Sequence, residues 1–122
     1  MFYEKNTMKK IYHLGNCSTC QRIIAQINPG KDVELVDIKQ QNIDAPTLDW
    51  IKEKVGSYEA LFSKRAMKFR SMGLHEMNLT EADYRRYILE EYTFLKRPVV
   101  INDGKIFVGN APKIVAAAKS SM

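Results

Sequence analysis

Both cysteines of the chain lie in one stretch, His13-Leu14-Gly15-Asn16-Cys17-Ser18-Thr19-Cys20-Gln21-Arg22, where they are three residues apart. An apolar, β-prone run precedes the pair, and a helix-like run follows it. A Cys-x-x-Cys pair at such a junction puts the first sulfur beside the free N–H groups of the first helical turn, where the helix dipole favours the thiolate. The second sulfur then lies close enough to attack a mixed disulfide on the first. The stretch therefore predicts a thiol–disulfide redox site.

Length and composition limit the class of protein. The 122 residues suit a single domain, 1–122, and 45% hydrophobic with 27% charged residues is ordinary for a globular protein. No apolar run reaches about 18 residues, and the first residues lack a signal-peptide pattern, so we expect a cytoplasmic monomer without membrane contact. In a reducing compartment, a lone close pair of cysteines indicates a catalytic, redox-sensing or metal-binding role.

The charge of the chain indicates partners only broadly. A formal charge of +5 attracts anions, including an oxyanion, glutathione, an acidic protein surface or nucleic acid. No helical segment carries a dense stripe of Lys and Arg with interleaved aromatic residues, so direct nucleic-acid binding is not expected. Zinc is also disfavoured, because only His13 and His75 could complete a site with the two cysteines.

The first part of the chain predicts a βαβ unit. We expect an irregular lead-in over residues 1–8 and a strand over residues 10–14. Three-and-four spacing of apolar residues predicts a helix from Ser18 that stops at Asn28-Pro29-Gly30. Alternation over residues 33–38 predicts a second strand, parallel to the first.

The middle of the chain, residues 39–96, contains only helical patterns. One helix begins near Pro46 and ends at Gly56, and one or two short helices follow over residues 58–72. Thr80 is expected to cap a further helix, because acidic residues follow it in the first turn. The segment predicts an all-helical insert.

The last part predicts a ββα unit. Two β-branched runs, 98–101 and 105–108, flank Asn102-Asp103-Gly104, and Asp-Gly between such runs is a strong hairpin signal. Asn110 is expected to cap a closing helix over residues 113–119. The whole chain thus predicts an α/β fold with a four-stranded mixed sheet, in which an insert (39–96) separates a βαβ half (1–38) from a ββα half (97–122).

Three ordered motifs carry a family resemblance that covers nearly the whole chain. They are Gly15-Asn16-Cys17 with the helix after it, Phe62-Ser63-Lys64-Arg65 in the insert, and Lys96-Arg97-Pro98-Val99-Val100 before the hairpin. Together they resemble the arsenate reductase (ArsC) family, a glutaredoxin-like branch of the thioredoxin fold that also contains Spx-type transcriptional regulators. The resemblance implies a thioredoxin-like fold and a thiol-dependent oxidoreductase.

The resemblance also implies roles for single residues. Cys17 takes the place of the catalytic cysteine, Arg65 and Arg97 take the places of two oxyanion-binding arginines, and Pro98 takes the place of the cis-proline beside the site. Guanidinium groups suit this role, because they present fixed pairs of N–H donors to an oxyanion or a carboxylate. Asn16 either donates a hydrogen bond to the sulfur or the oxyanion, or only accommodates the turn.

Two departures from the family pattern narrow the expected chemistry. Arsenate-reducing members carry a third arginine shortly after the hairpin, whereas residues 108–112 here read Val-Gly-Asn-Ala-Pro. Glutathione-using arsenate reductases rely on one cysteine in this loop, whereas the chain also has Cys20, which either resolves a Cys17 adduct or packs beneath it. We therefore expect a disulfide or oxyanion substrate, no resident cofactor, and glutathione, a glutaredoxin or a thioredoxin as electron donor. The alternative is an Spx-like redox-switched regulator that binds the RNA polymerase α subunit.

Overall fold

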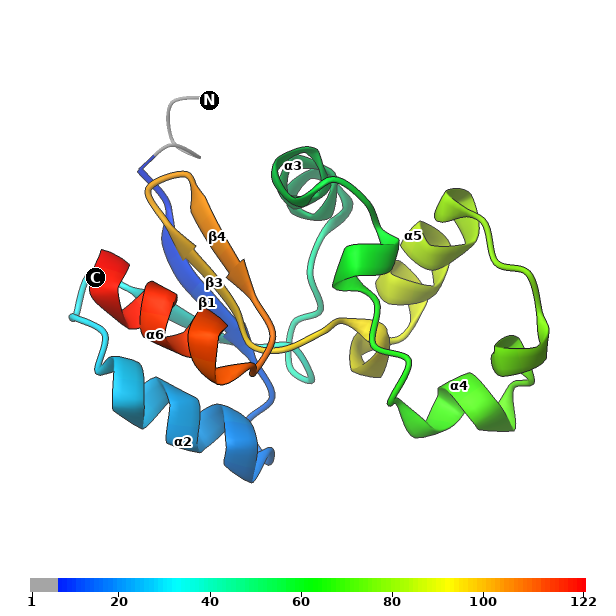
Figure 1. The fold of residues 1–122 in the computed structure, drawn as a ribbon, viewed down its shortest axis with the longest axis horizontal. Coiled ribbons are helices and arrows are strands. Elements are labelled where there is room, and N and C mark those ends of the chain that lie inside the picture. Colours follow the sequence, from blue (N-terminus) through cyan, green and yellow to red (C-terminus); the bar gives the residue numbers. More distant parts are fainter. Residues whose placement is uncertain (1–6) are drawn as a thin grey trace. The chain divides into compact units, whose positions relative to one another are not determined.

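The computed structural model describes residues 7–122, so most of the lead-in expected over residues 1–8 lies outside the described part. The chain forms two compact units, one made of residues up to 41 together with 97–122 and the other of residues 42–96 (Figure 1). The insert expected over residues 39–96 coincides closely with the second unit, while the organisation as one domain stays a prediction. Within residues 7–122, no helix is both long and apolar enough to span a membrane.

The first unit is built on a four-stranded mixed sheet, as the sequence predicts. Its strands β1 (Lys9–His13), β2 (Glu34–Asp37), β3 (Val99–Asn102) and β4 (Lys105–Val108) lie in the order β2-β1-β3-β4. β1 is parallel to β2 and antiparallel to β3, and β3 is antiparallel to β4. Asp103 and Gly104 both have positive φ, 50° and 86°, as a tight two-residue hairpin turn requires.

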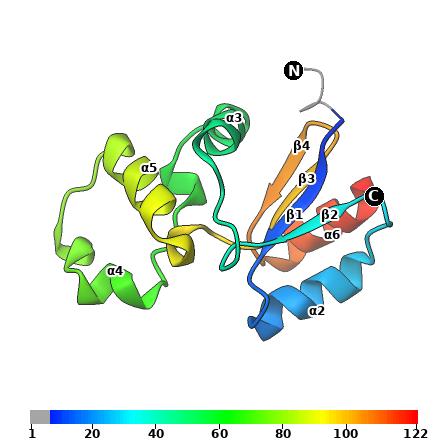
Figure 2. The ribbon, with the colours of Figure 1, turned by 180° about the vertical axis from the view of Figure 1, so that it is seen from behind.

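Helices α2 (Ser18–Ile27) and α6 (Pro112–Ser121) lie side by side on one face of this sheet, and both views show it (Figures 1 and 2). Ile11 and Val100 face each other across β1 and β3, and they pack in one buried cluster with Ile23 of α2 and Ala118 of α6. The helices are held because their apolar stripes cover the apolar face of the sheet.

The expected N-cap of the last helix is wrong. Ala111, rather than Asn110, occupies the N-cap position of α6, and its side chain makes no capping bond. Pro112 begins the helix instead, because its ring fixes a helical φ and its missing N–H removes a donor that would lack a partner in the first turn.

The second unit is helical, as the insert was predicted to be. Its helices are α3 (Ala45–Val55), α4 (Met67–Ser71) and α5 (Glu81–Glu90), with short 3₁₀ turns η1 (Glu59–Leu61), η2 (Leu74–Glu76) and η3 (Tyr92–Phe94). Thr80 caps α5 as expected, in a reciprocal capping box with Asp83. Phe62 stacks on Phe94 at a centroid distance of 4.9 Å and meets the edge of Tyr84.

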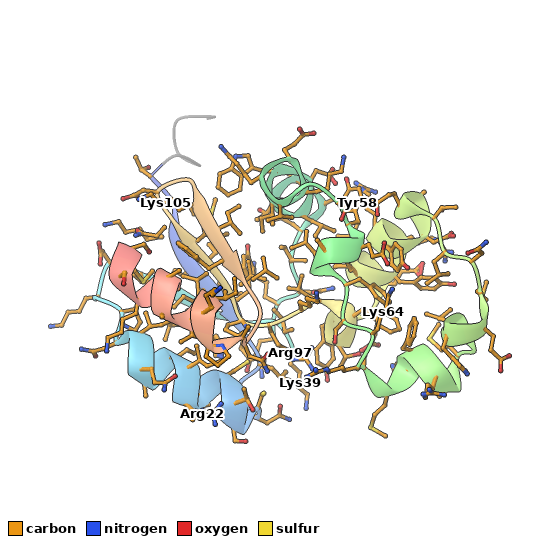
Figure 3. The ribbon with its side chains drawn as sticks, viewed as in Figure 1. Arg22, Lys39, Tyr58, Lys64, Arg97 and Lys105 are labelled. Carbon is orange, nitrogen blue, oxygen red and sulfur yellow. The ribbon has the colours of Figure 1, made fainter. Side chains whose placement is uncertain are left out.

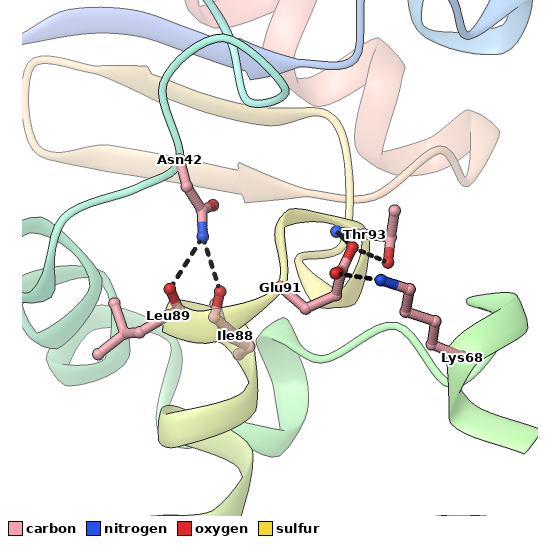
Figure 4. A network of polar contacts seen from close by, with 6 residues as sticks. All are labelled: Asn42, Lys68, Ile88, Leu89, Glu91 and Thr93. Atoms are coloured by element: carbon pink, nitrogen blue, oxygen red, sulfur yellow. Dashed lines mark hydrogen bonds and ion pairs between the residues drawn. The ribbon is translucent and has the colours of Figure 1, made fainter. Parts of the chain in front are cut away.

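The C-terminal end of α5 is tied down by side chains of the same unit. Asn42 donates from its amide nitrogen to the carbonyl oxygens of Ile88 and Leu89, at 3.0 and 3.3 Å (Figure 4). These carbonyls belong to the last helical turn, which has too few backbone partners. Glu91 then accepts hydrogen bonds from Lys68 and from the Thr93 hydroxyl, at 2.6 and 2.8 Å (Figure 4).

Candidate active site

Cys17 lies where β1 gives way to α2. Its backbone N–H donates to the Leu14 carbonyl at 3.0 Å, which closes the turn over Gly15 and Asn16. Its carbonyl accepts the first helical hydrogen bond, from the Gln21 N–H at 3.1 Å. With φ −93° and ψ 112°, Cys17 is the extended N-cap residue of α2. The sulfur therefore faces the free N–H groups of the first helical turn.

Two contacts fix the loop that carries Cys17. A Cβ at Gly15 would run into the carboxylate of Asp37, which ends β2, so glycine at this position leaves room for that side chain. The Gln21 side-chain amide lies 3.3 Å from both the Leu14 carbonyl and the His13 Nδ1. The sequence did not predict these contacts, although Gly15-Asn16 is a turn signal at the end of the predicted first strand.

The Cys17 sulfur is placed to be a thiolate. Its partial burial opposes ionisation, but the N–H and the thiol of Cys20 and the Thr19 N–H stabilise the thiolate enough to outweigh it, and the Arg97 guanidinium adds a favourable charge. The result is a pKa of Cys17 below its ordinary value. This agrees with the prediction from the helix N-terminus, and the local amides and the Cys20 thiol are its largest causes.

Cys20 behaves in the opposite way. Cys20 is 1% exposed, and burial, together with the Cys17 sulfur beside it, raises the pKa of the Cys20 thiol to about 11. Both cysteines are free thiols in this structure. Cys17 is therefore a partly exposed thiol that ionises readily, whereas Cys20 is a buried thiol that keeps its proton.

The strand register brings Arg97 and Pro98 to the same end of the sheet. Tyr12 of β1 pairs with Val99 of β3, and the two strands are antiparallel. Arg97 and Pro98, which precede Val99, therefore lie at the end of β1 from which the chain continues to Cys17 (Figure 3 labels Arg97). The Arg97–Pro98 peptide bond is cis, as the resemblance implies for this proline. The Pro98 carbonyl accepts from the Gly109 N–H at 2.9 Å, so the segment after β4 reaches the same place.

The structure gives less information on Arg65 and Asn16, the other two residues predicted to bind the substrate anion. Arg65 is exposed and lies in the second unit, just after the Phe62–Leu95 bridge, so its approach to Cys17 stays a prediction. Asn16 is exposed at the turn, and its side chain makes no hydrogen bond within residues 7–122. Over the same residues, no three His, Cys, Asp or Glu side chains gather as a metal site would require.

A four-stranded mixed sheet, a Cys-x-x-Cys pair at a helix N-terminus and a cis-proline ahead of the antiparallel strand define a thioredoxin-like protein. The model of the ArsC family matches residues 12–118, and the chain belongs to this family.

The relatives agree with this assignment. The chain is 28% identical over 110 residues to an arsenate reductase of Haemophilus influenzae, which covers 86% of this chain and 93% of that protein. An arsenate reductase-related protein of Brucella melitensis has a similar solution structure, with 30% identity, a TM-score of 0.68 and coverage of 91% and 93%. The arsenate reductase of Vibrio cholerae shares the fold, with a TM-score of 0.75 over 92% and 99% of the two chains at 18% identity.

Proposed function

We propose that this protein is a thiol-dependent oxidoreductase in which Cys17 is the nucleophile and Cys20 is the resolving thiol. The single observation that carries the proposal is the cysteine pair at the start of α2, in which the partly exposed Cys17 thiol has a lowered pKa and the buried Cys20 thiol a pKa of about 11. Such an asymmetry suits a first attack by Cys17 and a later attack by Cys20. Membership in the ArsC family supports the same class of chemistry.

With a disulfide substrate, the Cys17 thiolate attacks one sulfur and forms a mixed disulfide, and the other half leaves as a thiolate. Cys20 then loses its proton and attacks the Cys17 sulfur, which releases the second half as a thiolate. The substrate is reduced to two thiols, and the two cysteines are oxidised to one disulfide. An external thiol donor, for which we propose glutathione, a glutaredoxin or a thioredoxin, returns the pair to the reduced state.

The remaining residues would stabilise charge and position the substrate. Arg97 acts on Cys17 electrostatically, so it would also stabilise an anion bound or formed at the sulfur. Pro98 has no N–H to compete with a substrate strand beside the thiol. We assign Arg65 and Asn16 to binding the same anion by resemblance, and an oxyanion such as arsenate is a second substrate class for this pocket.

The decisive experiment measures reduction of arsenate and of a mixed disulfide of glutathione by the purified protein with each donor. Cys17→Ser should abolish turnover of both substrates. Cys20→Ser should accumulate a covalent adduct on Cys17, which intact-protein mass spectrometry detects. Adducts that form equally well in Cys17→Ser would show that the nucleophile is assigned wrongly, and wild-type protein that turns over neither substrate would contradict the proposed function.

Binding to the RNA polymerase α subunit and a cytoplasmic location stay predictions. The same cysteine pair could close into a regulatory disulfide, which is what the Spx-like alternative requires. Saturable binding of the polymerase α C-terminal domain that changes on oxidation, in a protein without turnover, would favour the regulator.

A further inference from the structure

The two units differ sharply in charge. Within the first unit, residues 7–41 and 97–122 contain nine Lys or Arg against four Asp or Glu, whereas residues 42–96 contain nine of each. The excess positive charge of the protein therefore belongs to the unit that carries Cys17. Helices α2 and α6 show this most clearly, since they contain Arg22, Lys113 and Lys119 and no acidic residue.

A groove of about 420 Å³ runs between these two helices. Its polar lining comes from both sides, with Arg22 and Gln26 on α2, Asn110 just before α6, and Lys119 in the last turn of α6. Its apolar lining is centred on Ile23 and Val115, which also pack into the core beneath. The groove thus combines an apolar floor with cationic and amide side chains at its edges.

The cations of the groove are not neutralised by the protein. Arg22 and Lys119 are both exposed, and within residues 7–122 neither forms an ion pair with a carboxylate (Figure 3 labels Arg22). Placing two such charges beside an apolar floor favours a ligand that brings carboxylates and an apolar group together. Nucleic acid fits poorly, because the lining offers only two cations and no aromatic ring on which a base could stack.

We propose that the groove between α2 and α6 binds an acidic segment of a partner protein. An apolar side chain of that segment lies over Ile23 and Val115, and acidic side chains on either side of it pair with Arg22 and Lys119. Arg22 comes five residues after Cys17, about 7.5 Å along the helix. A segment bound here brings its own protein close to the thiol, so the partner is the thiol donor. This last point rests on the proposed function, whereas binding to the groove does not.

The binding test uses a fluorescent peptide in which one leucine is flanked by glutamates on both sides. Fluorescence anisotropy should show saturable binding, and amide chemical shifts should move along α2 and α6. The double variant Arg22→Glu with Lys119→Glu should weaken binding at least tenfold, and a peptide with glycine for leucine should also bind more weakly. Lys105→Glu is the matched control, because Lys105 is exposed at the hairpin, outside the groove (Figure 3).

Three results would contradict the proposed binding of an acidic segment in the groove. They are a lack of saturable binding, an equal loss of affinity in Lys105→Glu, and equal competition by a DNA oligonucleotide of the same charge. The first would show that the groove takes no such segment, the second that only net charge matters, and the third that the site selects phosphates.

A kinetic arm tests the identity of the partner. The Cys17–Cys20 disulfide is reduced either by an acidic thioredoxin or by dithiothreitol, and the ratio of the two rates is compared between variants. The double variant should lower this ratio at least tenfold, while Lys105→Glu should leave it within twofold. An unchanged ratio would exclude the thiol donor as the partner. If the peptide binds but the protein shows no thiol exchange even with dithiothreitol, binding in the groove would be supported and the proposed function would be contradicted.

Discussion

Cys17 and Cys20 interact at the start of α2, and the pKa values of their thiols move in opposite directions, downward for Cys17 and upward for Cys20. The same interaction favours the thiolate of Cys17 and the protonated thiol of Cys20. Removing one partner should therefore change the chemistry of the other in a predictable direction.

Cys20→Ala should raise the pKa of Cys17. The substitution removes a thiol that donates to the Cys17 sulfur, and the thiolate loses that stabilisation, although the Thr19 and Cys20 N–H groups remain. The pH dependence of alkylation by iodoacetamide measures the change, since only the thiolate reacts. The midpoint should lie at higher pH than in the wild type. A midpoint that stays the same or falls would show that the thiol of Cys20 does not stabilise the thiolate.

Stability should fall in alkaline solution because of Cys20. A group whose pKa is raised by folding stabilises the protein fully below its unfolded pKa, and this contribution is lost as pH rises to the folded value of about 11. Between the ordinary value of 9.0 and the folded value, the loss is about 3 kcal/mol in the free energy of unfolding. Urea unfolding at a series of pH values measures it. Cys20→Ala should show a shallower alkaline decline, and parallel curves for the two proteins would contradict the raised pKa.

Cys17 should have the opposite effect on stability. Its pKa is lowered by folding, so its contribution is present above the unfolded pKa and is lost as pH falls through the folded value. The difference in unfolding free energy between wild type and Cys17→Ser should therefore grow as pH rises across that interval. Urea unfolding of both proteins gives the difference directly. A difference that is constant with pH would show that folding leaves the thiol's ionisation unchanged.

Gly15→Ala should destabilise the first unit. Its new methyl group meets the Asp37 carboxylate, so the Asp37 side chain must turn away from its position, at a cost of about 1 kcal/mol. Asp37→Gly in the same chain removes the obstructing carboxylate and should recover part of the loss. A double-mutant cycle by urea unfolding measures this coupling, and strictly additive effects would rule out the clash.

Thr80→Ala should destabilise α5 in the second unit by about 1 kcal/mol, because the Thr80 side chain accepts from the Asp83 N–H at 3.2 Å and Asp83 accepts in return from the Thr80 N–H at 2.9 Å. Hydrogen exchange over residues 81–90 reports the loss locally. Thr80→Ser keeps the hydroxyl and is the control. Equal exchange in both variants would mean that the cap contributes little.

Much of the fold followed from signals that act over a few residues. The helix after Cys17, the Asp103-Gly104 hairpin and the Thr80 cap each depend on spacing, turn chemistry or a capping side chain within one turn of backbone. The predicted N-cap at Asn110 was wrong for a local reason too. Pro112 starts the helix, so the N-cap position falls on Ala111.

The sequence by itself determined that Cys17 would stand at the start of a helix, because the helix signal and the cysteine occur in one short stretch. Only the tertiary structure decided what surrounds that cysteine. Arg97 comes beside it through the pairing of β1 with β3, whose partners are separated by more than eighty residues, and Asp37 meets Gly15 through the pairing of β1 with β2. The groove between α2 and α6 likewise exists only after both helices have packed on one sheet face. Local patterns cannot specify such contacts, because they depend on which strands pair and in which register.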